Sequence, residues 1–176
     1  TIGPNRGLEG VLDVISALKD QAFELHLLGH LSAEARYIFT NYNSVPIYLH
    51  EPVPPDEVIP FASQFDIGLA TEERTPLNRD MCLTNKIFTY IQAGLAVIVS
   101  DTSAQKQFLT EYPGIGKIYQ KTDTETLTDI LLNYNQSREE LIETRKSALL
   151  LGRQKLNWET EKEKFISVIK EVLDRN

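Results

Sequence analysis

One stretch, from Asn85 to Asp101, constrains the fold of this chain more than any other part of the sequence. Its first half has apolar residues at the spacing of one helical face, which are Ile87, Phe88 and Ile91. Gly94 stands where a helix can end in the left-handed conformation that glycine adopts without strain. An uninterrupted apolar run over residues 96–99 follows, which is typical of a strand covered on both faces. The stretch therefore predicts a helix followed by a buried parallel strand.

The start of this helix has the features of an anion site. Thr84 or Asn85 is of a type that caps helices, and the first N–H groups of a helix have no partner within it. Such groups bind anions when the helix follows the exit loop of a strand, and Lys86 adds a positive charge in the first turn. The same residues also fit a helix that only packs on a sheet, an arrangement that many α/β proteins share. Spacing alone leaves both interpretations open.

Strand-like and helix-like segments alternate along the chain. Strands are expected at residues 1–3, 23–28, 45–49, 66–70, 96–99 and 117–119. The length of 176 residues suffices for one domain but not for two of typical size. These features predict one Rossmann-like α/β domain over residues 1–176, with a doubly wound parallel sheet of about six strands and helices on both faces. The expected strand order is 3-2-1-4-5-6.

Polar residues mark the expected starts of the later helices. Asp123 and Asn157 are N-cap types, and Ser137 followed by Glu140 has the spacing of a capping box. The last helix carries an apolar stripe, made of Trp158, Phe165, Ile166, Ile169, Val172 and Leu173. Because an amphipathic helix usually buries such a stripe, we expect this helix to pack on its own domain. The alternative is that part of the stripe is exposed or mediates contacts between copies of the chain.

The charge balance limits the classes of partner. Acidic residues number 25 against 18 Lys and Arg, so the formal net charge is −7. Nucleic-acid binders usually present a basic face, and we therefore expect no nucleic-acid partner, although a local positive pocket could still bind a nucleotide. The sequence has neither a run of about 18 apolar residues nor a signal-peptide pattern, so no membrane span is expected.

The cysteine, the histidines and the first residues carry further expectations. Cys82 is the single cysteine, which excludes an internal disulfide and a Cys-rich metal cluster and fits a reducing compartment such as the cytoplasm.

His50 and Glu51 are adjacent, but nothing else stands at ligand spacing, so no metal is expected. The chain opens on Thr1-Ile2-Gly3, as if at the end of a strand, and without an initiator Met. We interpret it as a fragment of a longer protein.

The stretch over residues 85–101 reads Asn-Lys-Ile-Phe-x-Tyr-Ile-x-Ala-Gly-Leu-x-Val-Ile-x-Ser-Asp. This pattern resembles the donor-binding segment of retaining glycosyltransferases with the GT-B fold, of the group 1 or family 4-like kind. The resemblance covers essentially the whole chain, but only the C-terminal half of such an enzyme. It implies a donor-binding domain from which the N-terminal acceptor domain is missing.

The resemblance also implies a function. The donor would be a nucleotide-diphosphate sugar, and a glycan or lipid-linked acceptor would bind through the N-terminal domain, as in the biosynthesis of cell-surface polysaccharides. The family needs no metal or other cofactor, because positive side chains and helix-end amides stabilise the leaving diphosphate. The full-length enzyme is expected in the cytoplasm, with peripheral association at the inner face of the membrane as one option.

The same resemblance assigns roles to individual residues. Those expected to bind the donor diphosphate are Arg6, Lys86, Asn85 and Thr84. Those expected around the nucleotide are Gly3, Gly29, His30, Pro52, Val53 and Thr89. From the residues alone, Arg6 could equally be a solvated turn residue and His30 a solvated loop residue.

The chain departs from the family pattern at two glutamates, whose places are taken by Met81 and Thr89. A threonine hydroxyl can still hydrogen-bond a ribose hydroxyl, but the charge-assisted contact is lost. A lysine that is common just after Arg6 is absent as well. Glu72 or Glu73, in the long polar loop over residues 71–83, could help to hold the donor.

Several classes of function therefore stay open. The first is the donor domain of a glycosyltransferase, and we expect the isolated chain to bind nucleotide weakly and to transfer no sugar. The second is a degenerate, non-catalytic glycosyltransferase-like scaffold, which the missing glutamates favour. A sugar-nucleotide epimerase of the GT-B type would share the fold. A response-regulator-like receiver is excluded, because Gly3-Pro4-Asn5 offers no acidic cluster after the first strand.

Overall fold

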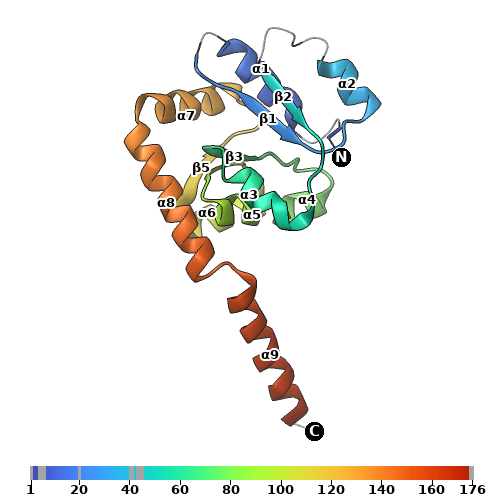
Figure 1. Cartoon of the computed structure of the whole chain (residues 1–176), viewed down its shortest axis with the longest axis vertical. Coiled ribbons are helices and arrows are strands. Elements are labelled where there is room, and N and C mark those ends of the chain that lie inside the picture. Colours follow the sequence, from blue (N-terminus) through green and yellow to red (C-terminus); the bar gives the residue numbers. More distant parts are fainter. Residues whose placement is uncertain (1, 4–6, 20, 40–41, 43–45, 175–176) are drawn as a thin grey trace.

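The computed structural model describes residues 2–3, 7–19, 21–39, 42 and 46–174, and Figure 1 shows how its elements are arranged. The strands are β1 (Leu25–Leu28), β2 (Ile47–His50), β3 (Ile67–Ala70), β4 (Ala96–Ser100) and β5 (Gly116–Tyr119). The helices before β4 are α1 (Leu8–Ala17), α2 (Ala33–Phe39), η2 (Pro55–Glu57), α3 (Val58–Ala62), α4 (Leu77–Met81) and α5 (Asn85–Ala93). Those after it are α6 (Ser103–Glu111), η3 (Pro113–Ile115), α7 (Thr124–Gln136), α8 (Arg138–Gln154) and α9 (Trp158–Asp174).

The strands pair in parallel, as the sequence predicts. β1 pairs with β2, and β4 lies between β3 and β5. In the larger sheet, Val97 stands opposite Gly68 on one side and Gly116 on the other. Parallel neighbours need long crossover connections, and the helices between the strands supply them. The chain is therefore an α/β protein with parallel sheets.

The single sheet of six strands is found only in part. One group has two strands and the other has three, and the neighbours within each group agree with the predicted order. The first predicted strand is represented by Ile2, which makes a parallel bridge to Leu31 just after β1. Its N–H donates to the His30 carbonyl at 2.7 Å, and its carbonyl accepts from the Ser32 N–H at 2.9 Å. One bridge does not make a ladder, so the order across the two groups stays a prediction.

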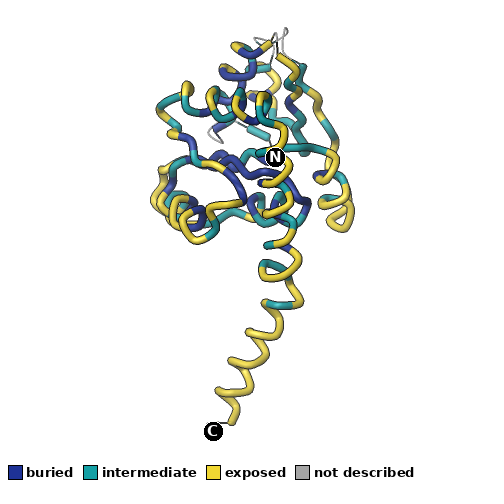
Figure 2. Tube along the Cα trace, turned by 90° about the vertical axis from the view of Figure 1, so that its left-hand side faces the viewer, coloured by how far each residue is buried: buried dark blue, intermediate teal, exposed yellow. Residues whose placement is uncertain are grey.

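β4 is buried along its whole length and has a separate core on each face. Successive side chains of a strand point to opposite faces. Ala96 and Ile98 pack in one core, with residues of α1, α7 and the start of α8. Val97 and Val99 pack in the other core, with residues of α5 and α6 and with Ala148 of α8. The continuous apolar run thus belongs to a strand between two helical layers. Figure 2 shows that the buried parts of the chain gather in its interior.

Three helix ends form as the sequence predicts. Gly94 ends α5 in the left-handed region, with φ 71°. The Asp123 carboxylate accepts from the Glu125 N–H at 3.0 Å at the start of α7. The Asn157 amide oxygen accepts from the Thr160 N–H at 2.9 Å at the start of α9. The glycine adopts the left-handed conformation at a helix C-terminus, and each polar side chain accepts from an N–H that has no partner within its helix.

The capping box predicted at Ser137 is only half formed. The Ser137 hydroxyl accepts from the Glu140 N–H at 3.4 Å, as expected. The Glu140 carboxylate, however, binds Lys117 Nζ on β5 at 2.7 Å instead of returning to the Ser137 N–H. That N–H donates to the Asn133 carbonyl at 2.7 Å. A charged partner is a stronger one for a carboxylate than a neutral amide, which explains the difference.

The terminal helix α9 does not pack on the domain, so that prediction is wrong. It follows α8 and extends away from the other elements (Figure 1), and it is exposed along its length (Figure 2). Trp158 is 67% exposed and Phe165 62% exposed. Both faces of the larger sheet are already covered by other helices, so the stripe has no place there. Among the described helices, α9 included, none has the length and apolar character that crossing a bilayer requires.

Candidate functional site

The loops that follow β3 and β4 form a polar rim, which we define as residues 71–74, 84–86 and 100–103. Ser100, at the end of β4, is fully buried. Its hydroxyl oxygen accepts from the Glu72 N–H at 2.9 Å, and it lies 3.0 Å from the Glu72 carbonyl and 2.8 Å from Gln105 Oε1. Gln105 Nε2 donates in turn to the Ala70 carbonyl at 2.9 Å. This network fixes the first residues of the long loop against the start of α6.

Lys86 and Glu72 form an ion pair in this rim. Lys86 Nζ lies 2.8 Å from Glu72 Oε1 and donates to the Thr71 carbonyl at 3.4 Å. The Glu72 side chain is only 4% exposed, whereas the Lys86 side chain is 41% exposed. A buried carboxylate needs a cation as partner because its own desolvation is unfavourable. Lys86 therefore stands in the first turn of α5, as the sequence predicts, but it already has an anionic partner.

The start of α1 lies against the same rim. Gly7 precedes α1 with φ 73°, and a Cβ added there would come within 3.0 Å of Thr71 Cβ. Since the Thr71 carbonyl also accepts from Lys86, the starts of α1 and α5 are neighbours on one side of the molecule. The predicted diphosphate residue Arg6 lies outside the described residues, directly before Gly7.

The predicted residues at the start of α5 are where the sequence places them. Thr84 is the N-cap residue, but its side chain makes no capping bond. Its hydroxyl oxygen is buried and has no hydrogen-bond partner in the described part of the chain. Buried hydroxyls are normally paired, so this oxygen is a group that can still take a partner. Asn85 is exposed, and the Thr89 hydroxyl donates to its carbonyl at 3.2 Å. Thr89 has thus committed its proton to the helix and can only accept from a ribose hydroxyl.

The predicted nucleotide residues at the ends of β1 and β2 lie next to each other. The Gly29 N–H donates to the His50 carbonyl at 2.9 Å, which joins the two strand ends. His30 Nδ1 lies 3.4 Å from Glu51 Oε2, and both side chains are largely exposed. In a solvated pair of this kind, the histidine remains accessible to a ligand.

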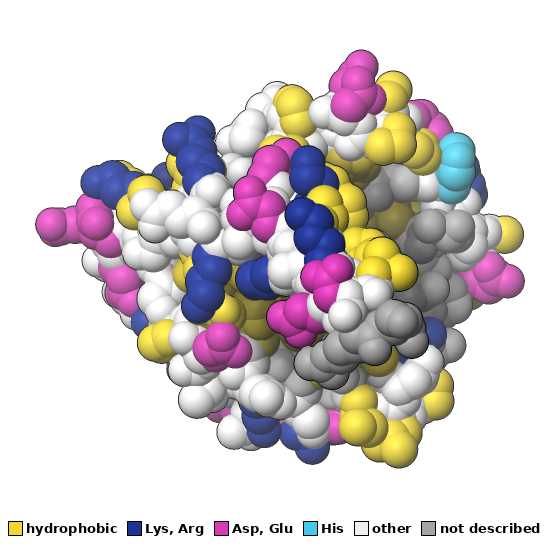
Figure 3. Space-filling view, turned by 90° about the horizontal axis from the view of Figure 1, so that it is seen from below, with side chains coloured by type: hydrophobic (Ala, Val, Ile, Leu, Met, Phe, Trp, Pro, Cys, Tyr) yellow, Lys and Arg dark blue, Asp and Glu magenta, His cyan; other side chains and the backbone are white. Residues whose placement is uncertain are grey.

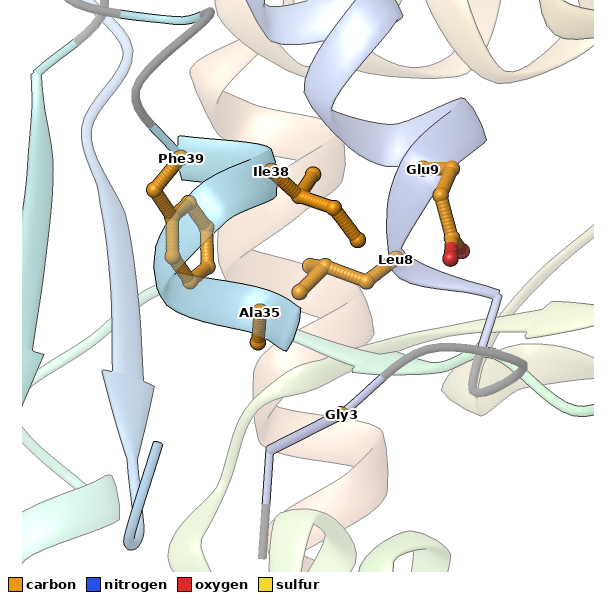
Figure 4. Close-up of a pocket in the computed structure, with 6 residues that line it drawn as sticks. All are labelled: Gly3, Leu8, Glu9, Ala35, Ile38 and Phe39. Carbon is orange, nitrogen blue, oxygen red and sulfur yellow. The ribbon is translucent and has the colours of Figure 1, made fainter. Parts of the chain in front are cut away.

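Gly3 lines a small recess between α1 and α2, which Figure 4 shows. The other lining residues are Leu8, Glu9, Ala35, Ile38 and Phe39. The recess is mostly apolar and has no room for a water molecule, so it cannot hold a nucleotide. Pro52 and Val53 follow β2 and are exposed and half-buried, respectively.

The long loop after β3 makes charged contacts that the sequence analysis missed. Arg74 Nη2 donates to Asp101 Oδ2 at 2.8 Å. The Asp80 carboxylate accepts from the Ser103 hydroxyl at 2.6 Å and from the Ser103 N–H at 3.0 Å. These contacts tie the loop to the end of β4 and the start of α6. The length and polarity of the loop in the sequence indicate a functional segment. They do not reveal its partners, which lie more than 20 residues away in the chain.

An open cleft of about 490 Å³ lies beside this loop. Glu73, Thr75, Pro76 and Arg79 line it, and Glu73 is bound by Lys121. Its volume lies within the range of small-molecule sites, roughly 300–1,000 Å³. The lining carries charges of both signs, so the cleft by itself favours no single class of ligand.

The negative charge of Glu72 acts on buried groups around it. Burial, and then the charges of Asp101 and Glu72, raise the pKa of Tyr119. Burial and the charge of Glu72 raise the pKa of Tyr90 to about 12. Both phenols therefore stay neutral to a higher pH than an exposed tyrosine does.

The described residues contain no group of three or more His, Cys, Asp or Glu side chains that could hold a metal ion. Metal-independent chemistry stays a prediction. On the face that Figure 3 shows, Lys and Arg side chains alternate with Asp and Glu side chains, and the coloured residues form no continuous basic patch there. Nucleic-acid binders usually present such a patch, and the face in view does not have this pattern.

The profile of a family described as glycosyl transferase-like matches residues 11–162 of the sequence. The chain belongs to this glycosyl transferase-like family. The match spans the rim and both helical layers of the larger sheet. No curated protein matches the sequence of this glycosyl transferase-like chain.

Solved structures share the fold of the glycosyl transferase-like chain. Sucrose-phosphate synthase of Thermosynechococcus elongatus is similar over 99% of this chain and 44% of its own, with a TM-score of 0.80 and 14% identity. HepE of Anabaena, solved in complex with UDP-glucose, is similar over 97% and 46%, with a TM-score of 0.76 and 12% identity. WaaG, a glycosyltransferase involved in lipopolysaccharide biosynthesis, is similar over 86% and 40%, with a TM-score of 0.68 and 11% identity.

The glycosyl transferase-like chain thus spans less than half the length of each of these proteins. At identities this low, the likeness to these structures shows a shared fold. Together with the family profile, they confirm the resemblance to GT-B glycosyltransferases at the level of family and fold.

Proposed function

We propose that this chain binds a nucleotide-diphosphate sugar and is the donor half of an enzyme that passes the sugar to a glycan or lipid-linked acceptor. The observation that carries the proposal is the meeting of three elements at the rim. Thr71, directly after β3, lies against Gly7 at the start of α1, and its carbonyl accepts from Lys86 at the start of α5. Ligands of doubly wound folds bind at this carboxyl edge of the sheet.

The chemistry of sugar transfer explains why such a rim is useful. When the bond between the sugar and the diphosphate breaks, negative charge develops on the phosphate oxygen that leaves. Arg6, Lys86 and the first N–H groups of α5 would stabilise this charge, with Thr84 and Asn85 beside them. Each well-placed donor of this kind typically contributes about 3–4 kcal/mol to the transition state. No metal is needed when side chains and backbone supply the positive charge.

The nucleotide would extend from the rim toward the ends of β1 and β2. Gly29 and His30 lie there, with Pro52 and Val53 in the next loop, and a ribose hydroxyl could donate to Thr89. UDP-glucose is bound in the HepE structure, which shares this fold, and that supports a nucleotide sugar as the ligand. WaaG takes part in lipopolysaccharide biosynthesis, which supports a cell-surface glycan as the product. The acceptor site, and any peripheral contact of a cytoplasmic enzyme with the membrane, belong to the rest of the enzyme in this proposal.

Isothermal titration of this chain with UDP, GDP and ADP, and with their glucose derivatives, tests the proposal. We expect weak binding of at least one nucleotide, with a Kd of about 0.1–1 mM, equivalent to roughly 4–5.5 kcal/mol. Arg6→Ala and Lys86→Ala should each weaken it at least fivefold. Lys164→Ala is the matched control, because Lys164 is an exposed cation on α9, paired with Glu161. No binding of any of these ligands at 5 mM would contradict donor binding.

A second candidate is a scaffold that has lost catalysis but kept the fold. Met81 and Thr89 stand in place of the glutamates of the resembled family, and Lys86 is already paired with Glu72. A scaffold of this kind should bind none of the nucleotides, and Arg6→Ala and Lys86→Ala should then leave every titration unchanged.

A further inference from the structure

The ion pair of Lys86 with Glu72 is unusual for a cation that is to bind phosphate. Lys86 Nζ lies 2.8 Å from Glu72 Oε1. With only 4% of the Glu72 side chain exposed, water cannot replace Lys86 as its partner. A ligand that took Lys86 away from Glu72 would leave a buried carboxylate without a cation, which is strongly unfavourable.

The position of Glu72 is fixed from the backbone side as well. Ser100 Oγ lies within 3.0 Å of both the N–H and the carbonyl oxygen of Glu72. Both Ser100 and Gln105, which completes this network, are fully buried. The backbone that carries the Glu72 side chain is therefore held in place by buried groups.

We propose that Glu72 sets the phosphate affinity of the rim by neutralising Lys86 and thereby weakens the hold on the diphosphate. This inference rests on the proposed function. A phosphate oxygen that accepts from Lys86 Nζ comes within about two hydrogen-bond lengths, roughly 5–6 Å, of the Glu72 carboxylate. Like charges at that distance repel strongly where water is excluded. The Lys86 ammonium keeps one further N–H besides those that face Glu72 and Thr71, so it can still contact a phosphate.

The consequence is selectivity by ligand charge. A free nucleoside diphosphate carries a terminal phosphate monoester and is more negative than the same diphosphate with a sugar attached. Glu72 repels the more negative ligand more, so it favours the donor over the nucleotide that is left after transfer. Glu72 is in this sense a specificity-determining residue that acts through Lys86.

Titration of wild type, Glu72→Gln, Lys86→Met and the double variant with UDP, GDP, ADP, their glucose derivatives and inorganic pyrophosphate tests this inference. Glu72→Gln keeps the shape of the side chain and removes its charge. We expect it to bind the nucleoside diphosphates and pyrophosphate at least tenfold tighter than wild type does. The gain should disappear when Lys86→Met is added, and it should be smaller for the sugar nucleotides than for the free diphosphates.

Glu140→Gln is the matched control, because it is the same change at a half-buried carboxylate outside the rim that pairs with Lys117 instead of Lys86. It should change each affinity less than threefold. Thermal unfolding of every variant shows that the domain is still folded. A destabilised Glu72→Gln protein is titrated at a temperature well below its Tm, so the affinity comparison stands.

Four outcomes are distinguishable. Tighter binding that depends on Lys86 supports the inference. Binding by wild type that is unchanged or weaker in Glu72→Gln overturns it and leaves donor binding intact. A gain for pyrophosphate alone, with no nucleotide bound by any variant, supports the role of Glu72 and contradicts the proposed function. No binding of any ligand by any variant overturns both.

Discussion

At the scale of single residues, the polar groups of the rim are satisfied by partners that are far apart in the sequence. Ser100 on β4 hydrogen-bonds the backbone of Glu72 and the side chain of Gln105. Lys86 on α5 forms an ion pair with the Glu72 carboxylate. Each buried group depends on the other elements being in place. The rim is therefore both a candidate binding site and a point at which the fold is sensitive to change.

Replacement of Ser100 by alanine tests this sensitivity. The change removes the hydroxyl that contacts Glu72 and Gln105 and leaves buried polar groups without a partner, so the free energy of unfolding should fall by about 1–3 kcal/mol. Thr128→Ala is the control, because its hydroxyl donates to the Thr124 carbonyl at an exposed site. Its cost should be less than about 0.5 kcal/mol in urea titrations. An equal loss of unfolding free energy in the two variants would show that the buried network stabilises the fold no more than one exposed hydrogen bond does.

The tyrosines near the rim predict how stability depends on alkaline pH. Burial and the charge of Glu72 raise the pKa of Tyr90 to about 12, and burial with Asp101 and Glu72 raises the pKa of Tyr119. An unfolded tyrosine has a pKa near 10, so above that pH the unfolded chain binds fewer protons than the folded one. The stability from these groups is present in full below about pH 10 and falls from there toward about pH 12.

Urea titrations between pH 8 and 11.5, with tyrosinate absorbance as a second readout, measure this effect. Tyr90→Phe should reduce the slope of stability against pH, whereas Tyr37→Phe, at a site 75% exposed, should leave it unchanged. A flat profile up to pH 11.5, or equal slopes in the two variants, would show that burial does not hold the phenols neutral.

At the scale of elements, the helix from Asn85 to Ala93 and the strand that follows it depend on one glycine. Gly94 has φ 71°, and a Cβ there would lie 3.3 Å from Leu149 Cβ on α8. The residue thus reverses the chain between α5 and β4 and also lets α8 approach. Two independent reasons, conformation and space, require glycine at this place.

Gly94→Ala should lower the free energy of unfolding by about 1–2 kcal/mol, the approximate cost of a left-handed conformation with a Cβ. Gly10→Ala is the opposite case, because Gly10 lies in the interior of α1 and the nearest atom to an added Cβ, Thr124 Cγ2, is 3.9 Å away. That change should stabilise the protein by about 0.5–1 kcal/mol. Thermal and urea unfolding measure both, and the same sign in both variants would contradict this reading of the two sites.

At the scale of the whole molecule, helices cover both faces of the larger sheet, and one helix stands apart from the other elements. The cores on both faces of β4 contain buried residues of α1, α5, α6, α7 and α8, and none of the described residues of α9 is buried. The apolar stripe that predicted packing is exposed. In the proposed enzyme, we expect another part of the protein to cover it.

The exposed state of α9 predicts rapid hydrogen exchange along it. Isolated helices of about this length are marginal in water, so amides of α9 should exchange orders of magnitude faster than those of α5. Removal of residues 158–176 should leave the free energy of unfolding within about 0.5 kcal/mol. Slow exchange in α9 at low protein concentration, or a large loss of stability on truncation, would show that the helix packs on this domain after all.

The sequence by itself determined most of the elements and their kind, although α4 lies inside the stretch over residues 71–83 that was expected to be a loop. The apolar run at β4, the helical spacing of α5 and the end at Gly94 are local patterns, and local backbone geometry is enough to produce them. The same holds for the caps at Asp123 and Asn157. The resemblance to the family was carried by the single stretch over residues 85–101. Position in the fold was also predictable for Lys86, because the carboxyl ends of parallel strands meet at one edge.

Only the tertiary structure decided which groups meet. Lys86 pairs with Glu72, Glu140 pairs with Lys117 in place of closing its capping box, and Arg74 reaches Asp101. The apolar stripe of α9 is exposed in the tertiary structure, whereas its amphipathic spacing predicts burial. Periodicity reports which face of an element is apolar but not what lies opposite. Ion pairs and packing depend on distances between segments that are remote in the chain, and those distances exist only once the chain has folded.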